Sequence, residues 1–140
     1  MDIAFVIDRV RTQVIALRQV GGAADMDAAL EAAPAVPCAF VIPLGERGQL
    51  IGSTQITRQS LHRAIGVVIG IANRRDAKGQ ASMQDLAPLR QALKVALIGF
   101  VPNAANGEPM SFTEGHLLRL DGDGYLWWLD AFTYQDFYRS

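Results

Sequence analysis

The sequence predicts an α+β fold, in which two main helices pack on a mostly antiparallel sheet of about four strands. Three observations predict it. Between Leu61 and Ile71 large aliphatic residues alternate with small ones, which is the period of a strand. Apolar residues recur at helical spacing in two other segments, and the last third of the chain holds an Asp-Gly turn between two apolar runs. The expected order is helix, strand, strand, helix, strand, strand, in a single domain spanning residues 1–140.

The composition is that of a soluble globular protein. Half of the 140 residues are hydrophobic, 19% are charged, and the net charge is −1. A protein that coats nucleic acid usually carries a basic excess, so specific nucleic-acid binding is not expected. No apolar run reaches the length that spans a membrane, and the start of the chain does not resemble a secretion signal. A single cysteine excludes an internal disulfide framework.

The first helix is predicted from about Ile3 to Gln19. Asp2 stands at the N-cap position, and Gly21-Gly22 stand where the helix should stop. The alanine-rich segment Asp25–Ala33 is expected to form one or two helical turns, which the following prolines end. The apolar stripe of the first helix comprises Ile3, Val6, Ile7, Val10, Val14 and Leu17.

Two strands follow in the prediction. The first, Cys38–Leu44, reads as a strand buried on both faces, with Pro43 near its end or at an edge. The glycine-bearing stretch Gly45–Thr57 is typical of an exposed, mobile loop. The alternating strand Leu61–Ala72 comes next and leads into a charged turn over residues 73–79. Its bulky face suits a core, and we expect a helix of the same chain, rather than a neighbouring subunit, to cover its small face: Ala64, Gly66, Gly70 and Ala72.

The second main helix has two possible starts. Ser82 and Asp85 match a capping box, whereas Pro88 fits only the first turn of a helix and favours a start at Asp85. Gly99 and Pro102 should end the helix, and residues 103–110 should form a loop. Its apolar face comprises Leu86, Leu89, Leu93, Ala96 and Leu97.

The last third of the chain is a predicted hairpin. Phe112–Leu120 and Tyr125–Tyr138 flank the turn Asp121–Gly124, and the returning strand is aromatic. Both faces of that strand are too apolar for a sheet with one side in water, so either helices and loops cover them or neighbouring subunits do. One face carries Leu126, Trp128, Phe132, Tyr134 and Tyr138 with Asp130 and Asp136; the other carries Tyr125, Trp127, Leu129, Ala131 and Phe137.

Catalytic and metal chemistry find little support in the residues. Cys38 with His62 or His116 is a conceivable nucleophile and base, but a free cysteine in an apolar run is usually a small buried hydrophobe. The acidic turn Asp121–Gly124 lacks the further ligands of a calcium loop, so we interpret it as a hairpin turn. The two histidines lack partners at ligand spacing, and neither a metal nor a cofactor is predicted.

Basic residues gather near the ends of the alternating strand. Glu46 and Asp76 are interspersed with them, which favours a solvated rim or a protein interface over a phosphate site. The basic residues are Arg47, Arg58, Arg63, Arg74, Arg75 and Lys78.

Taken in order, several short segments resemble the tail terminator proteins of long-tailed bacteriophages, including the terminator-like proteins of Mu-type contractile phages. Phe100 departs from the pattern, because a tryptophan is expected after the glycine, although an aromatic ring is kept. The segments that carry the resemblance are Ala39–Glu46, Val67–Asn73 with Asp76 and Gly79, Leu89-Arg90, Ala96–Pro102, Gly115–Leu117 and Trp128–Phe132.

The resemblance implies a small α+β domain that assembles as a hexameric ring on the tail tube. The ring would end tube polymerisation and offer a surface to the head completion or connector protein, while DNA passes through it. Neither catalysis nor a cofactor is implied, and the place of action would be the head-proximal end of the virion tail, after synthesis in the host bacterial cytoplasm. The candidate contacts with a subunit or the tube are Arg47, Arg58, Arg74, Arg75, Trp127 and Tyr134.

Three rival functions remain open at this point. One is another head-tail connector or completion protein of the same particle. A small hydrolase that uses Cys38 is a second, and replacement of that cysteine would abolish its activity. The third is a ligand-binding domain with an apolar pocket under the hairpin.

Overall fold

The structure, a computed structural model, describes residues 3–50, 58–73, 80–102, 107–121 and 124–139. Those residues form an α+β domain with three helices and one mixed five-stranded sheet. The elements are α1 (Ala4–Gln13), β1 (Gln19–Gly21), α2 (Ala23–Glu31), β2 (Cys38–Leu50), β3 (Arg58–Ala72), α3 (Gln80–Leu97), β4 (Ser111–Asp121) and β5 (Tyr125–Arg139).

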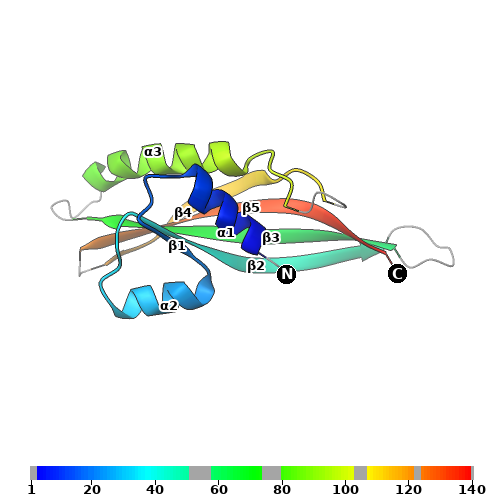
Figure 1. Ribbon diagram of the computed structural model, residues 1–140, viewed down its shortest axis with the longest axis horizontal. Coiled ribbons are helices and arrows are strands. Elements are labelled where there is room, and N and C mark those ends of the chain that lie inside the picture. The colour runs from blue at the N-terminus through cyan, green and yellow to red at the C-terminus, as the bar shows by residue number, and fades with distance from the viewer. Residues whose placement is uncertain (1–2, 51–57, 74–79, 103–106, 122–123, 140) are drawn as a thin grey trace.

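The sheet has the strand order β1-β2-β3-β5-β4. All neighbouring strands are antiparallel except β1, which runs parallel to β2. The alternating strand β3 therefore lies at the centre, as its sequence predicts. Helices α1 and α3 cover one face of the sheet and α2 lies against the other, while β2, β3 and β5 run on past the helices towards the C-terminus (Figure 1).

The main core lies between the sheet and the pair α1 and α3. Val6 and Val10 of α1, and Leu86 and Leu93 of α3, are buried against the large residues of β3. Each such aliphatic side chain contributes about 1.5–3 kcal/mol by leaving water. The sheet side of this core comprises Ala39, Val41, Ile65, Val67, Ile69, Ile71, Leu126, Phe132 and Tyr134.

The small face of β3 is filled mostly by large side chains of its neighbours. A Cβ added at Gly66 would lie 2.5 Å from Leu129, and one added at Gly70 would lie 2.6 Å from Trp127. Ala29 of α2 is buried in the same cluster. A helix of the same chain does contribute, but it is the short α2, because both longer helices pack on the bulky face. The glycines are needed here because they leave room for the side chains of Leu129 and Trp127.

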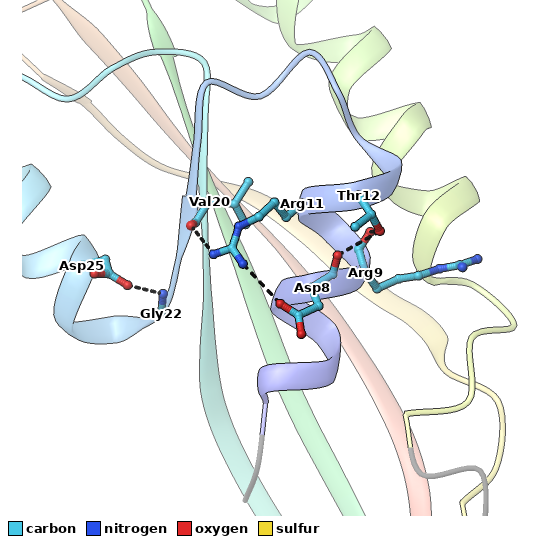
Figure 2. A network of polar contacts seen from close by, with 7 residues as sticks. All are labelled: Asp8, Arg9, Arg11, Thr12, Val20, Gly22 and Asp25. Carbon is cyan, nitrogen blue, oxygen red and sulfur yellow. Dashed lines mark hydrogen bonds and ion pairs between the residues drawn. The ribbon is translucent and has the colours of Figure 1, made fainter.

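The first helix is shorter than predicted. It ends at Gln13, after which residues 14–17 form a turn and Gln19–Gly21 form β1 against Cys38–Phe40. Figure 2 shows the Arg11 guanidinium donating to the Val20 carbonyl oxygen at 3.1 Å while it also contacts Asp8. Pairing with β2 satisfies backbone groups that a longer helix would have used, so tertiary contacts outweigh the apolar periodicity.

The alanine-rich segment forms a helix as expected, two residues earlier than predicted. Asp25 Oδ2 accepts a hydrogen bond from the Gly22 backbone N–H at 2.9 Å, which caps the start of α2 (Figure 2). The helix ends at Glu31, before the two prolines, and the Val36–Pro37 peptide bond is cis.

The strand from Cys38 is longer than predicted. Residues 45–50, expected in a loop, continue β2, and the rest of that loop lies outside the described residues. Only its beginning is buried, whereas Pro43 and Leu44 are exposed. Beyond Phe40, β2 pairs only with β3 among the described strands, so Pro43 does lie on an edge strand, where its missing N–H is tolerated. The pairing with β3 slips between Pro43 and Gly45.

Helix α3 begins earlier than either predicted start. It includes Gln80, so Ser82 is not the cap: its hydroxyl donates to Asn73 Oδ1 at 2.7 Å. Pro88 lies inside the helix rather than in its first turn, and its side chain is exposed. Gly99, with a φ of +88°, ends the helix as predicted.

The hairpin is present as predicted. Strands β4 and β5 pair antiparallel, and the face assignment of β5 is correct: Trp128 and Phe132 face the main core while Trp127 and Leu129 face α2. The prediction missed β1 and the parallel pair it makes, so the sheet has one strand more than expected.

Candidate interaction surfaces

An apolar pocket opens on the α2 side of the sheet. Its volume is about 190 Å³, smaller than the roughly 300–1,000 Å³ of typical small-molecule sites. It is bounded by α2, the edge strand β4 and the three strands between them in the fold. The lining residues are Met26, Leu30, Ile42, Val68, Leu118, Arg119, Trp127 and Leu129.

Trp127 is the one aromatic residue among those that line this pocket. The side chain is only 3% exposed, and its indole Nε1 has no partner among the described residues. The benzo edge of the ring, Cε3 and Cζ3, lies over Gly70 of β3. The N–H is on the opposite edge of the indole and is itself buried. Buried donors are nearly always satisfied, and leaving one unpaired costs about 1–3 kcal/mol.

Large apolar side chains are also exposed elsewhere on the surface. Ile15 is 89% exposed in the turn after α1, and Val95 is 70% exposed on α3. The edge strand β4 exposes Leu117, Leu118 and Leu120. An isolated exposed apolar residue needs no explanation, but several near a free strand edge are typical of a protein contact.

A polar cluster lies on the α1 and α3 side, where the strands run past the helices. Arg63 of β3 lies 3.2 Å from Glu46 of β2 and 3.8 Å from Asp136 of β5. Tyr134 is hydrogen-bonded to Arg63, and burial raises the pKa of its phenol although the arginine acts in the opposite direction. Charged side chains thus connect β2, β3 and β5, and we interpret the cluster as one that stabilises the sheet.

A second polar tie joins α3 to β5. Arg90 donates from Nε and Nη2 to the Asp130 carboxylate, with its closest contact at 2.9 Å, and Trp128 Nε1 donates to Asp130 Oδ1 at 2.9 Å. The guanidinium also lies 4.5 Å from the centre of the Trp128 ring. Asp130 is fully buried and paired, so it serves the fold rather than offering a free carboxylate.

The three predicted contact residues whose side chains the structure describes do not form one patch. Arg47 is exposed on β2, Trp127 is buried on the α2 side, and Tyr134 is 5% exposed in the main core. Arg74 and Arg75 lie outside the described residues, as does the side chain of Arg58. Because Trp127 and Tyr134 are buried, they would affect an interface only by positioning the surface residues that cover them. Their interface role stays a prediction.

Cys38 does not form a dyad with either histidine. Its thiol is fully buried, lies 3.8 Å from the Gly70 carbonyl oxygen, and has a pKa that burial raises to about 11. His62 is eight residues along β3 from Gly70, which is about 26 Å of strand. His116 is on β4, three strands away from β2. Cys38 is the buried hydrophobe that the apolar run predicts.

Metal-binding chemistry also finds no support in the described ranges, where no three His, Cys, Asp or Glu side chains gather. The acidic turn considered for calcium lies partly outside those ranges, at residues 122–123. A second hollow of about 370 Å³ lies beside the start of α3, with Asp85 as its one carboxylate. None of the helices in the described part of the chain has the length and apolarity to cross a membrane.

The α2-side pocket could not be derived from the sequence. Two of its walls, Met26 and Leu30, come from a helix expected only as a turn or two, and a register slip near Leu118 brings β4 into it. The apolar pocket considered under the hairpin is the nearest expectation. The sequence feature that pointed to such a pocket is the excess of apolar residues on both faces of β5.

Comparison with known proteins gives one clear match. A family model described as "Phage tail terminator protein" matches residues 1–139. The comparison with curated proteins finds no match to this chain.

Proposed function

The chain belongs to the phage tail terminator family, and we propose that it caps the phage tail tube as a hexameric ring. In this role the ring ends tube polymerisation and presents a surface for head-tail joining. Membership of the family makes the chain a structural component of a phage tail. The match to residues 1–139 is the observation that carries the proposal, since it spans almost the whole chain.

The surfaces of the molecule support assembly. A ring built from one repeated head-to-tail contact needs two different complementary patches on each subunit. The described residues offer separate exposed apolar sites: the turn at Ile15, the flank of α3 at Val95, and the pocket beside Leu30 and Leu118. These sites give a subunit more than one place at which a neighbour or the tube can pack.

The proposed partners are further copies of the chain, the tail tube protein and the head completion or connector protein. DNA passes through the ring without sequence-specific contacts, in keeping with a net charge of −1. The protein acts at the head-proximal end of the virion tail after synthesis in the host cytoplasm, as a non-enzyme without a cofactor. The candidate contact residues remain Arg47, Arg58, Arg74, Arg75, Trp127 and Tyr134.

Electron microscopy of the protein mixed with polymerising tail tubes tests the proposal. We expect six-fold caps at one end of each tube and a halt to further growth once the cap is in place. Tubes polymerised without the protein, and tubes mixed with an unrelated protein of similar size, are the controls. Continued growth with the protein bound elsewhere on the particle would favour a separate connector role.

A further inference from the structure

Helix α2 is attached to the sheet by very little buried surface. Of its nine residues only Ala29 is buried, Met26 is half-buried, and the others are exposed. A buried alanine contributes one methyl group to a core, whereas α1 and α3 bury valine and leucine side chains on the opposite face of the sheet. Among the described elements α2 is the one helix on its face (Figure 1). The apolar attachment of α2 is therefore much weaker than that of the other two helices.

The packing beneath α2 is also incomplete. The α2-side pocket, a hollow of about 190 Å³, has walls from this helix and from β4, so the helix leaves part of the apolar face unfilled. Leu30 of α2 lines that hollow and is still 43% exposed. Protein interiors are normally packed as densely as organic crystals, and side chains beside a void lose the contacts that would hold them in place. Helix α2 thus fits the sheet loosely.

Polar contacts do not compensate for this loose packing. The Asp25 carboxylate accepts from the Gly22 backbone N–H, which caps the helix itself (Figure 2), and no side chain of α2 forms a hydrogen bond or ion pair with the described part of the sheet. Asp27 and Glu31 are like charges at i and i+4, and Glu31 lies in the last turn, where the helix dipole disfavours an anion. A helix of nine residues is only marginally stable on its own. Helix α2 therefore depends on its few contacts with the sheet.

The chain is fixed on both sides of α2 but not next to it. Helix α2 is the crossover between the parallel strands β1 and β2, in which Val20 pairs with Ala39. On the far side the Pro37 carbonyl oxygen accepts from the Arg18 backbone N–H at 2.7 Å, and β2 is paired with β3 along its length. Between these anchors the helix is flanked by Gly22 and by exposed residues 32–33. It can leave the sheet without disturbing either strand.

The side chains under α2 include the single cysteine of the chain. Cys38 and Trp127 belong to the cluster that Ala29 helps to cover, and both are almost fully buried. They lie together on the α2 face, because a Cβ added at Gly70 would meet both Cys38 Sγ and the Trp127 ring. In the closed fold this thiol is shielded from solvent and inert.

We propose that α2 opens away from the sheet as a unit while the rest of the domain stays folded, and that opening exposes the apolar face beneath it together with the Cys38 thiol. The fold then contains a removable cover. Opening costs less free energy than global unfolding, because it breaks only the contacts of one weakly attached helix. The inference concerns the chain by itself and does not depend on the capping role.

Thiol labelling measures the opening. The whole chain is mixed with an excess of the chromogenic disulfide reagent dithionitrobenzoate, and the labelling rate of Cys38 is followed as urea is raised from zero towards the unfolding transition. We expect a slow rate that is nearly independent of urea at first, because local opening exposes little surface, and that rises steeply only near global unfolding. A rate that rises steeply from the lowest urea concentrations would overturn the proposal.

Variants separate local opening from global unfolding. Ala29→Gly removes the buried methyl and weakens the helix, so labelling at low urea should become about tenfold faster. Glu31→Lys replaces a repulsion of Asp27 with an attraction and suits the helix end, so labelling should become about threefold slower. Ala87→Gly is the matched control, since Ala87 is exposed in α3 and the variant weakens the domain without touching α2. It should leave the rate at low urea unchanged, and equal acceleration in both glycine variants would overturn the proposal.

Hydrogen exchange followed by mass spectrometry tests the opening without the thiol. The hydrogen-bonded amides of α2 should exchange together, with protection on the order of a hundredfold lower than that of α3 and β3. Protection of α2 equal to that of α3 would overturn the proposal. Both measurements are made without tail tubes, so their outcome is independent of whether the chain caps a tube.

Discussion

Arg90 of α3 and Asp130 of β5 form a two-pronged ion pair that fastens the longest helix to the sheet. The carboxylate is fully buried, and Nε and Nη2 of the arginine lie 3.1 and 2.9 Å from its two oxygens. The indole N–H of Trp128 supplies a further donor to the same group. A buried carboxylate destabilises the fold when the groups that pair with it are removed.

Replacing Arg90 by methionine should lower the free energy of unfolding by about 3–5 kcal/mol, because Asp130 is then left charged and buried without its main partner. Urea denaturation followed by circular dichroism measures the change. The double variant Arg90→Met with Asp130→Asn should recover part of the loss, since the uncompensated charge is gone. Equal losses in the single and double variants would show that the uncompensated charge of Asp130 is not the cause of the destabilisation.

Gly115 leaves the space in which that ion pair lies. A Cβ at this position would clash with Asp130 Oδ1 and would come within 2.7 Å of Arg90 Nη2. Gly115→Ala should therefore cost about 1–3 kcal/mol. Gly45→Ala is the matched control, because an added Cβ there meets nothing within 4 Å. Thermal unfolding of the two variants should separate them clearly, and similar midpoints would contradict the packing argument.

Stability should fall at alkaline pH through Cys38. Burial raises the pKa of its thiol from 9.0 to about 11, so between these values the unfolded chain releases a proton that the folded chain retains. The stabilising effect is complete below pH 9 and is lost as the pH rises towards 11, by an amount on the order of 2 kcal/mol at pH 11. Burial raises the pKa of Tyr134 as well, which adds to the loss in the same direction. Unfolding free energies measured from pH 8 to 11 should decline less steeply in Cys38→Ala.

Tyr134 should behave first as a core residue. It is 5% exposed, so Tyr134→Ala should destabilise the monomer by about 3–5 kcal/mol. Tyr134→Phe loses only the hydrogen bond to Arg63 and should cost about 0.5–1.5 kcal/mol. Chemical denaturation of both variants gives these values. If Tyr134→Ala unfolds like wild type yet fails to assemble, the residue is an interface residue despite its burial.

Arg47 should affect assembly without affecting the fold. Its side chain is exposed on β2, so Arg47→Glu should change the free energy of unfolding by less than about 0.5 kcal/mol. If this part of β2 meets the tube or a neighbour, capping measured by electron microscopy should weaken in the variant. Capping that stays at the wild-type level would remove Arg47 from the candidate contacts.

The sequence was sufficient for elements whose apolar pattern is long. The alternation in β3 predicts a central strand, and the Asp-Gly turn predicts the β4–β5 hairpin, because both signals are local. The face assignment of β5 follows from the same period of two, which holds along the described part of the strand.

The missing parts depend on contacts between distant segments. Strand β1 is three residues long and exists because Gln19–Gly21 meet Cys38–Phe40, which no local pattern signals. The helical periodicity through Val14 and Leu17 is real, but both residues reach the core from a turn. The pocket depends on where α2 lies and on the slip in the β4 register. The sequence therefore predicts apolar residues in these elements but not how they are arranged around a pocket.

The irregular course of β2 has a consequence for how this molecule behaves when it is concentrated. Beyond Phe40 the outer side of β2 faces no other described strand, and an open edge of that kind is a template for fibrous aggregates. Pro43 brings no N–H to such a template, the slip beside it breaks the regular spacing, and the charged Glu46 and Arg47 follow. These features make the edge a poor template for pairing with the same edge of another copy.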